Sequence, residues 1–151
     1  MKGTGVTWDV AVRAVGPGGS SAFAHYRTVT RPVSSALLKK STGSLRWAKK
    51  SDGRYYRDGA YQTSAKGATI IISTARSVKR VRLIVRTGPG EGRLAVYVGG
   101  VRVGTRSTAA SRTTWAKQLD VVLSRARSGT VVVKTLDHKP VRVSAVGLGR
   151  S

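Results

Sequence analysis

Cysteine and asparagine are absent from this chain of 151 residues, and only six of its side chains are acidic. Without cysteine, neither a disulfide framework nor a thiolate-bound metal is possible. Without asparagine, and with glutamine only at Gln62 and Gln118, the chain has few amide groups of the kind that read adenine edges or sugar hydroxyls. Sequence-specific recognition of nucleic acid is therefore disfavoured.

The six acidic residues do not form an obvious catalytic pair. Glycoside hydrolysis needs two carboxylates that face each other across the sugar. Asp52 and Asp58 each precede a glycine, which is typical of turns. Asp9 and Asp120 lie within expected strands, where we expect arginines to pair with them, and Glu91 lies between two glycines in an expected turn.

Other catalytic and cofactor motifs are missing as well. The two histidines, His25 and His138, lie far apart, so a zinc site is disfavoured, and neither is near a glycine-flanked serine elbow. His138 is expected in a loop. The glycines of segment 88–92 are not followed by the lysine and serine or threonine of a phosphate-binding loop. We therefore predict that the protein is not an enzyme and has no cofactor and no metal.

Positive charge is what the chain has in excess. Lysine and arginine number 28, giving a formal net charge of +22. Such a charge attracts polyanions in a salt-dependent way, whatever the fold. Nucleic acid bound without sequence preference, anionic wall polymers, acidic polysaccharides and anionic lipid headgroups all fit this description. The alternative is that the charge only keeps the protein soluble.

No apolar run approaches the roughly 20 residues needed to cross a bilayer, so no transmembrane segment is predicted. The first residues also lack the continuous apolar segment of a secretion signal. If the protein is exported, we expect its signal upstream of Met1.

The patterning of the chain predicts an all-β protein. Valine, threonine and glycine are abundant, which favours strands over helices. Residues 6–15 and 22–30 alternate around a glycine-rich turn at 16–20, which predicts a β-hairpin. Closely spaced strand candidates follow, as in a sandwich or barrel. They are residues 68–74, 78–87, 93–98 with 101–105, 117–123, 130–136 and 141–148.

Alternation also predicts the orientation of two strands and of one turn. Val81, Leu83 and Val85 share one face of their strand. The other face carries Arg80, Arg82, Ile84 and Arg86, and its arginines are expected to line a solvent face. In segment 93–98 the leucine and the valines share a face in the same way. Gly99-Gly100 suits a two-residue hairpin turn that requires positive φ.

Residues 44–150 resemble the jelly-roll-like β-sandwich modules at the C-termini of actinobacterial exported proteins. The resemblance rests on an opening tryptophan, a tyrosine- and glycine-rich segment, a glycine turn with its strand and hairpin, and a closing strand. These are Trp47, Tyr55, Tyr56, Gly59, Ala60, Tyr61, and segments 64–68, 88–100 and 141–148. Residues 6–30 resemble the last hairpin of a fibronectin type III domain.

The resemblance implies an antiparallel β-sandwich of the carbohydrate-binding-module kind, preceded by a hairpin remnant. The expected division is a partial fibronectin type III-like hairpin at 1–33, a linker at 34–44 and the sandwich module at 45–150. Related modules are secreted and non-catalytic, and many accompany carbohydrate-active or wall-associated enzymes. The chain departs from them in having Gly99-Gly100 where an Asp-Gly turn is usual, and in lacking the acidic pairs that hold calcium.

The best candidate binding segment runs from residue 54 to residue 61, where aromatic and cationic side chains mix in an expected loop. Its candidate ligand-binding residues are Arg54, Tyr55, Tyr56, Arg57 and Tyr61. A separate set of candidates forms a basic patch that would hold phosphate or carboxylate groups. These are Lys49, Lys50, Lys79, Arg80, Arg82 and Arg86. Trp47, Tyr97 and Trp115 are further stacking candidates, although core packing is the simpler expectation for the two tryptophans.

Three functions remain open. The first is an extracellular accessory or adhesion module that binds cell-surface or wall glycan and orients the upstream domains of the same polypeptide. The second is a polyanion or nucleic-acid binder whose binding falls steeply as salt rises. The third is a structural spacer that binds nothing at physiological salt.

Overall fold

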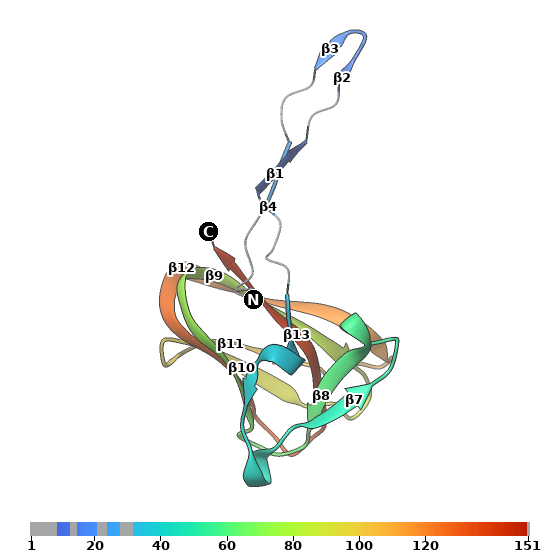
Figure 1. Ribbon diagram of the computed structural model, residues 1–151, viewed down its shortest axis with the longest axis vertical. Coiled ribbons are helices and arrows are strands. Elements are labelled where there is room, and N and C mark those ends of the chain that lie inside the picture. The colour runs from blue at the N-terminus through green and yellow to red at the C-terminus, as the bar shows by residue number, and fades with distance from the viewer. Residues whose placement is uncertain (1–8, 13–14, 21–23, 28–31, 151) are drawn as a thin grey trace.

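The computed structural model describes residues 9–12, 15–20, 24–27 and 32–150. These residues form antiparallel strands joined by short connections, three of which contain a 3-10 helix (Figure 1). The strands of the sandwich are β5 (Val33–Ser34), β6 (Lys39–Lys40), β7 (Ala48–Ser51), β8 (Gly59–Thr63), β9 (Thr69–Thr87), β10 (Arg93–Val98), β11 (Val101–Ser107), β12 (Thr114–Thr135) and β13 (Val141–Arg150). The 3-10 helices are η1 (Ser35–Leu37), η2 (Gly43–Leu45) and η3 (Tyr56–Asp58).

One curled sheet forms both layers of the sandwich, in the order β11-β10-β12-β9-β13-β8-β7, with β5 on β13 and β6 on β9. The long strands β9 and β12 pass through both layers. Residues 69–75 of β9 pair with 129–134 of β12 in the first layer, beside β10. Residues 80–87 of β9 pair with 114–122 of β12 in the second layer, and β13 and β8 follow. The antiparallel β-sandwich predicted from the sequence is confirmed.

The sequence predicted two strands where β9 is one, and again two where β12 is one. Pairing between them changes register between Val122 and Val131, and Ser77 adopts a positive φ of 52°. At this bend the alternation of apolar side chains breaks, which the pattern presents as a gap between strands. Strands β9 and β12 nevertheless remain hydrogen-bonded to neighbouring strands through the bend, so each is one continuous strand.

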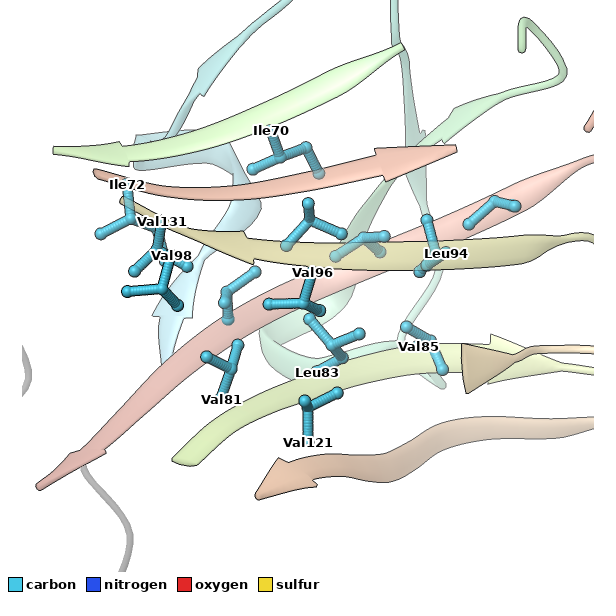
Figure 2. Close-up of a cluster of buried hydrophobic side chains, with 14 of the residues drawn as sticks. Ile70, Ile72, Val81, Leu83, Val85, Leu94, Val96, Val98, Val121 and Val131 are labelled. Atoms are coloured by element: carbon cyan, nitrogen blue, oxygen red, sulfur yellow. The ribbon is translucent and has the colours of Figure 1, made fainter. Parts of the chain in front are cut away.

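The core lies between the two layers. Val81, Leu83 and Val85 of β9 point inward and are fully buried, as their alternation predicted. Leu94, Val96 and Val98 of β10 face them from the other layer, and Figure 2 shows these side chains meeting between the strands. Burial of apolar surface, worth about 25 cal/mol per Å², is the main stabilising contribution of such a core.

The predicted glycine turn is present and is closely packed. Gly99 and Gly100 have φ values of 57° and 78°, the conformation of a tight hairpin turn. Behind the turn runs β12, where Gly129 has a φ of 133°. A Cβ on Gly129 would lie 2.6 Å from the Cα of Gly99, so glycine is needed for the two backbones to approach.

The predicted N-terminal hairpin is confirmed over the residues that the structure describes. Strand β1 (Asp9–Val12) pairs antiparallel with β4 (Ala24–Arg27), and β2 (Val15–Gly16) pairs with β3 (Gly19–Ser20) around Pro17-Gly18. Figure 1 draws this hairpin outside the sandwich. The remaining parts of the predicted strands, including Trp8, lie outside the described residues. Across the described ranges, no helix is long and apolar enough to span a membrane.

Candidate functional site

The connection between β7 and β8 presents an ordered arginine. Asp52 accepts hydrogen bonds from the backbone N–H of Arg54 (3.0 Å), from its Nε (2.9 Å) and from its Nη2 (2.7 Å). The side-chain hydrogen bonds from Arg54, followed by the backbone one, lower the pKa of Asp52 to about 2. The turn role predicted for Asp52 is therefore present, and the turn also fixes the guanidinium group of Arg54.

That guanidinium group lies on an aromatic pair. The Cζ of Arg54 is 3.8 Å from the ring centroid of Trp115, at the start of β12. The Trp115 ring meets Tyr55 edge to face, with centroids 5.1 Å apart and planes at 75°. Arg86, from β9, brings its own Cζ to 4.9 Å from the Trp115 centroid. These four residues, Arg54, Tyr55, Arg86 and Trp115, are called the aromatic cluster below.

Tyr55 and Trp115 differ in how much of each is exposed. Tyr55 is only 7% exposed and serves as the buried edge of the cluster, whereas Trp115 is partly exposed. Burial is the main reason that the pKa of the Tyr55 hydroxyl lies above its usual value. The core position expected for Trp115 is therefore only partly reached. No local pattern links Trp115 to the 54–61 segment, so sequence reasoning missed this contact.

The buried carboxylate of Glu91 supports the aromatic cluster by pairing with two arginines. Arg86 Nη1 and Arg142 Nη1 both donate to Oε1 of Glu91, whose side chain is 1% exposed. Nε of Arg142 also donates to Oε1 of Gln62 at 2.8 Å, which connects β13 to β8. Glu91 lies at the expected turn, where its backbone N–H donates to the Gly88 carbonyl at 3.4 Å. Its side chain points inward and pairs with the two guanidinium groups.

The ionisation of Glu91 reflects two opposed effects. Burial raises the pKa of this carboxyl, and the charges of Arg142 and Arg86 lower it in part. Two polar atoms of the group, Oε2 of Glu91 and Nε of Arg86, are buried without a hydrogen-bond partner among the described residues. Each retains capacity for one further hydrogen bond.

The predicted ligand-binding residues divide between two faces of the second layer. Arg54 and Tyr55 join Trp115, and Tyr56 and Arg57 follow directly in η3, where Arg57 is exposed with a φ of 53°. Tyr61 instead belongs to β8 and packs against the core, with Nζ of Lys40 4.0 Å from its ring centroid. The segment expected to be a loop is therefore a loop only as far as residue 58.

The predicted basic patch is also divided. Lys49 and Lys50 are exposed on β7. Arg82 Nε and Nη2 each donate to Asp120 at 2.7 Å, and Arg80 Nη1 donates to it at 3.2 Å, which confirms the pairing expected for Asp120.

The expectation that alternate arginines of β9 face open solvent is wrong for Arg82 and Arg86. Their side chains are 23% and 20% exposed, and Ile84 between them is buried at 4%. The sheet curls and the carboxylates of Asp120 and Glu91 cover these positions, so they form ion pairs instead of a free cationic face. Lys79 lies further along β9, where its Nζ donates to the carbonyl of Ser124.

Trp47 and His138 occupy the positions expected of them. Trp47 is 8% exposed in the core, and its indole N–H donates to the Thr69 carbonyl at 3.1 Å. His138 is exposed in the connection between β12 and β13. Within the part of the chain that the structure describes, no three histidine or acidic side chains gather where a metal ion would bind. The side chain of His25 lies outside this part.

Chemically, the aromatic cluster is suited to binding. Trp115 supplies a partly exposed ring, and Arg54 supplies N–H groups that Asp52 does not use. The carboxylates of Asp52 and Glu91, which pair with Arg54 and Arg86 of the cluster, are each engaged by arginine.

Comparison with solved structures finds the same fold in several polysaccharide-related proteins. The module CsCBM6-3 of Clostridium stercorarium, solved with cellobiose, has a TM-score of 0.61 at 14% identity and covers 80% of this chain and 94% of its own. A family 43 arabinoxylan arabinofuranohydrolase of Bacillus subtilis, solved with cellotetraose, has a TM-score of 0.62 at 12% identity. That match covers 92% of this chain and 33% of the hydrolase.

A third similar structure is the CBM36-1 domain of a multidomain xylanase from the hindgut metagenome of Trinervitermes trinervoides. It has a TM-score of 0.52 at 8% identity and covers 80% of this chain and 97% of the domain. No family model matches the sequence, and no curated protein matches it. At these identities, the similarity establishes the jelly-roll-like fold of carbohydrate-binding modules and nothing about the ligand of this chain.

Proposed function

We propose that the protein is a non-catalytic glycan-binding module and that the aromatic cluster is its binding site. The observation that carries the proposal is the joint position of Trp115, Tyr55 and Arg54, which are brought together from β12 and from the β7–β8 connection. The carbohydrate-binding modules among the similar structures support it at the level of fold.

The cluster offers the two kinds of contact that a sugar needs. Arg54 already covers part of the Trp115 ring, so the apolar C–H face of a pyranose would pack on the part of the ring that remains exposed. Sugar hydroxyl groups would accept hydrogen bonds from the guanidinium N–H groups of Arg54 that Asp52 does not use. Asp52 already orders Arg54, so little side-chain entropy remains to be lost when a ligand binds.

The buried ion pairs below the cluster contribute rigidity. Glu91 fixes Arg86 against Trp115 and also fixes Arg142, which Gln62 holds from the neighbouring strand. A binding group is most effective when its own supports leave it a single position. In this proposal Glu91 is a supporting residue and does not touch the ligand.

The proposal extends to the setting of the module. Residues 1–33 would be the end of a fibronectin type III-like domain, 34–44 a linker and 45–150 the glycan-binding module of an exported protein. In the structure β5 and β6 pair with β13 and β9, so part of the proposed linker would lie against the module. The module would hold partner domains close to a cell-surface or wall glycan.

Binding to a panel of neutral and acidic polysaccharides, measured at about 0.15 M salt, tests the proposal. At that ionic strength exposed charges more than about 8 Å apart are largely screened. We expect Trp115→Ala to weaken binding by roughly fivefold or more, since a stacked ring is worth about 1–3 kcal/mol. Arg54→Ala should weaken it to a similar extent, since hydrogen bonds from a charged group are worth about 1.5–3 kcal/mol.

Arg93→Ala is the matched control. Arg93 is 58% exposed and pairs with Asp137, as Arg54 is 61% exposed and pairs with Asp52. Among the described residues, however, only Arg54 and Arg86 stack on Trp115, and Arg93 does not. Binding by the control should equal that of the parent. Glycan retention that neither Trp115→Ala nor Arg54→Ala reduces would reject this site.

A further inference from the structure

The positive charge of this protein is unevenly compensated. Four of its six acidic side chains, Asp52, Glu91, Asp120 and Asp137, form ion pairs in the structure. Their partners are Arg54, Arg80, Arg82, Arg86, Arg93 and Arg142. An anionic ligand would therefore bind most favourably beside the cations that have no carboxylate partner.

Five such cations lie in or next to the segments where β9 and β12 bend between the layers. The residues of this bend patch are Arg76, Lys79, Arg125, Arg127 and Arg150. None of them makes an ion pair within the described part of the chain. Arg76, Arg125 and Arg150 are exposed, and the other two are partly buried.

Strand pairing places two of these arginines beside the same residue of β9. Val78 of β9 pairs with Arg127 of β12 on one side and with Arg150 of β13 on the other. Neighbouring strands lie about 4.8 Å apart, so the main chains of these two arginines are separated by about 10 Å. The Nζ of Lys79 donates to the Ser124 carbonyl, which ties the two sides of the bend together beside Arg125.

The bend patch is separate from the aromatic cluster. Arg86 lies eight residues after Val78 on β9, a distance of about 26 Å along an extended strand. Figure 1 shows the bends of β9 and β12 near the C-terminus, on the opposite side of the sandwich from β7 and β8. The acidic residue nearest to the patch along these strands, Asp120, is already bound to Arg82 and Arg80.

We infer that the bend patch is a second binding surface, which takes a linear acidic polysaccharide carrying repeated carboxylate or sulfate groups. Four of its five cations are arginines, whose planar guanidinium groups bind such oxyanions through two parallel hydrogen bonds. Binding releases cations that are condensed on the linear polyanion, in proportion to the number of its anionic groups that the patch neutralises.

The side chains around the patch favour a polysaccharide over a nucleic acid. Segments 74–80 and 122–129 contain neither an aromatic residue for base stacking nor an amide for reading base edges. Small hydroxyl side chains accompany the arginines instead, among them Ser77, whose backbone N–H bonds to Ser128 Oγ at 3.0 Å. The patch can therefore read repeated negative charge but not bases.

Heparin and polygalacturonate serve as probes, and their binding to the full chain is measured by titration between about 0.05 and 0.3 M NaCl. In the test variant Arg76, Arg125 and Arg150 are all changed to Gln, which removes three exposed charges. We expect affinity at 0.15 M salt to fall at least tenfold, and the slope of log K against log salt to become shallower by up to about 3, by analogy with phosphate contacts.

The matched control removes three exposed charges from connecting loops elsewhere, with Lys66, Arg112 and Lys139 changed to Gln. Circular dichroism and the thermal midpoint establish that both variants are folded. An equal loss of binding in the two variants would mean that only net charge matters, which overturns the inference. Binding of duplex DNA that is as tight as that of heparin and equally sensitive to the patch would overturn the choice of partner.

Trp115→Ala separates this inference from the proposed function. We expect it to leave heparin binding unchanged while it weakens binding of neutral glycan. If Trp115→Ala loses only neutral-glycan binding, the inference of a second surface at the bend patch is supported. If the triple Gln variant of the bend patch loses only polyanion binding, the proposal for the aromatic cluster is unaffected. A Trp115→Ala protein that loses both to the same extent would contradict the existence of two surfaces.

Discussion

Replacing Glu91 by alanine would leave two guanidinium groups without the carboxylate that they share. Arg86 and Arg142 are each only 20% exposed, and Glu91 is 1% exposed, so water cannot readily take over its place. Removing one partner of a buried ion pair costs about 3–5 kcal/mol, because the remaining charge stays buried and uncompensated. This is a large share of the roughly 5–15 kcal/mol that stabilises a typical domain.

For a chain of this size each kcal/mol lowers the midpoint of thermal unfolding by about 2–4 °C. We therefore expect Glu91→Ala to lower it by about 6–20 °C, as followed by circular dichroism and calorimetry. Glu91→Gln retains the side-chain volume and one carbonyl acceptor, so its loss should be smaller than that of alanine.

Asp137→Asn provides the comparison with a more exposed pair. Its partner Arg93 is 58% exposed, and such pairs contribute about 1 kcal/mol or less. If Glu91→Ala lowered the midpoint no more than Asp137→Asn does, the ion pairs of Glu91 would be effectively solvated. Glu91 would then not be the residue that holds Arg86 and Arg142 in fixed positions.

Two further predictions concern the backbone crossing and the pH dependence. Gly129→Ala should destabilise the protein by about 2 kcal/mol or more in urea unfolding, because a Cβ would lie 2.6 Å from the Gly99 Cα and because the φ of 133° is strained for alanine. Gly100→Ala, whose Cβ meets nothing within 4 Å, should cost less; equal losses would show that the close approach is unimportant. The hydrogen bonds from Arg82 lower the pKa of Asp120, so its stabilising contribution is present above the unfolded value of about 3.9 and is lost as pH falls through the lower folded value. Asp120→Asn should therefore reduce stability at neutral pH and flatten its fall in acid, and an unchanged pH profile by thermal unfolding would contradict the pairing.

Local pattern sufficed for much of the fold. The alternation of Val81, Leu83 and Val85 identified the core face of β9, and the Gly99-Gly100 pair identified a hairpin turn with positive φ. Both features arise from the two-residue period of a strand and from the steric freedom of glycine, which act between near neighbours in the chain. The all-β class and the scarcity of catalytic groups likewise follow from composition.

Local sequence patterns predicted only part of the candidate site. Arg54 and Tyr55 were singled out by their mixture of charge and aromaticity, and Asp52 by the glycine that follows it. Trp115 and Glu91 belong to the same site, but nothing near them in the sequence connects them to residue 54. Tyr61 was grouped with Tyr55 because the two residues are close in the sequence. Strand β8 begins between them, however, and Tyr61 packs against the core.

The sequence by itself determined that this chain forms strands, which faces of β9 and β10 are apolar, where the glycine turns lie, and that positive charge dominates. The tertiary structure alone decided that β9 and β12 continue through a bend, that Trp115 meets Arg54, that Glu91 turns inward, and that the bend patch forms. The physical reason is the separation along the chain of the residues that interact. Alternation and turn preferences are properties of a few consecutive residues, whereas these meetings depend on strand order and register, which are fixed only when distant segments pack on a common core.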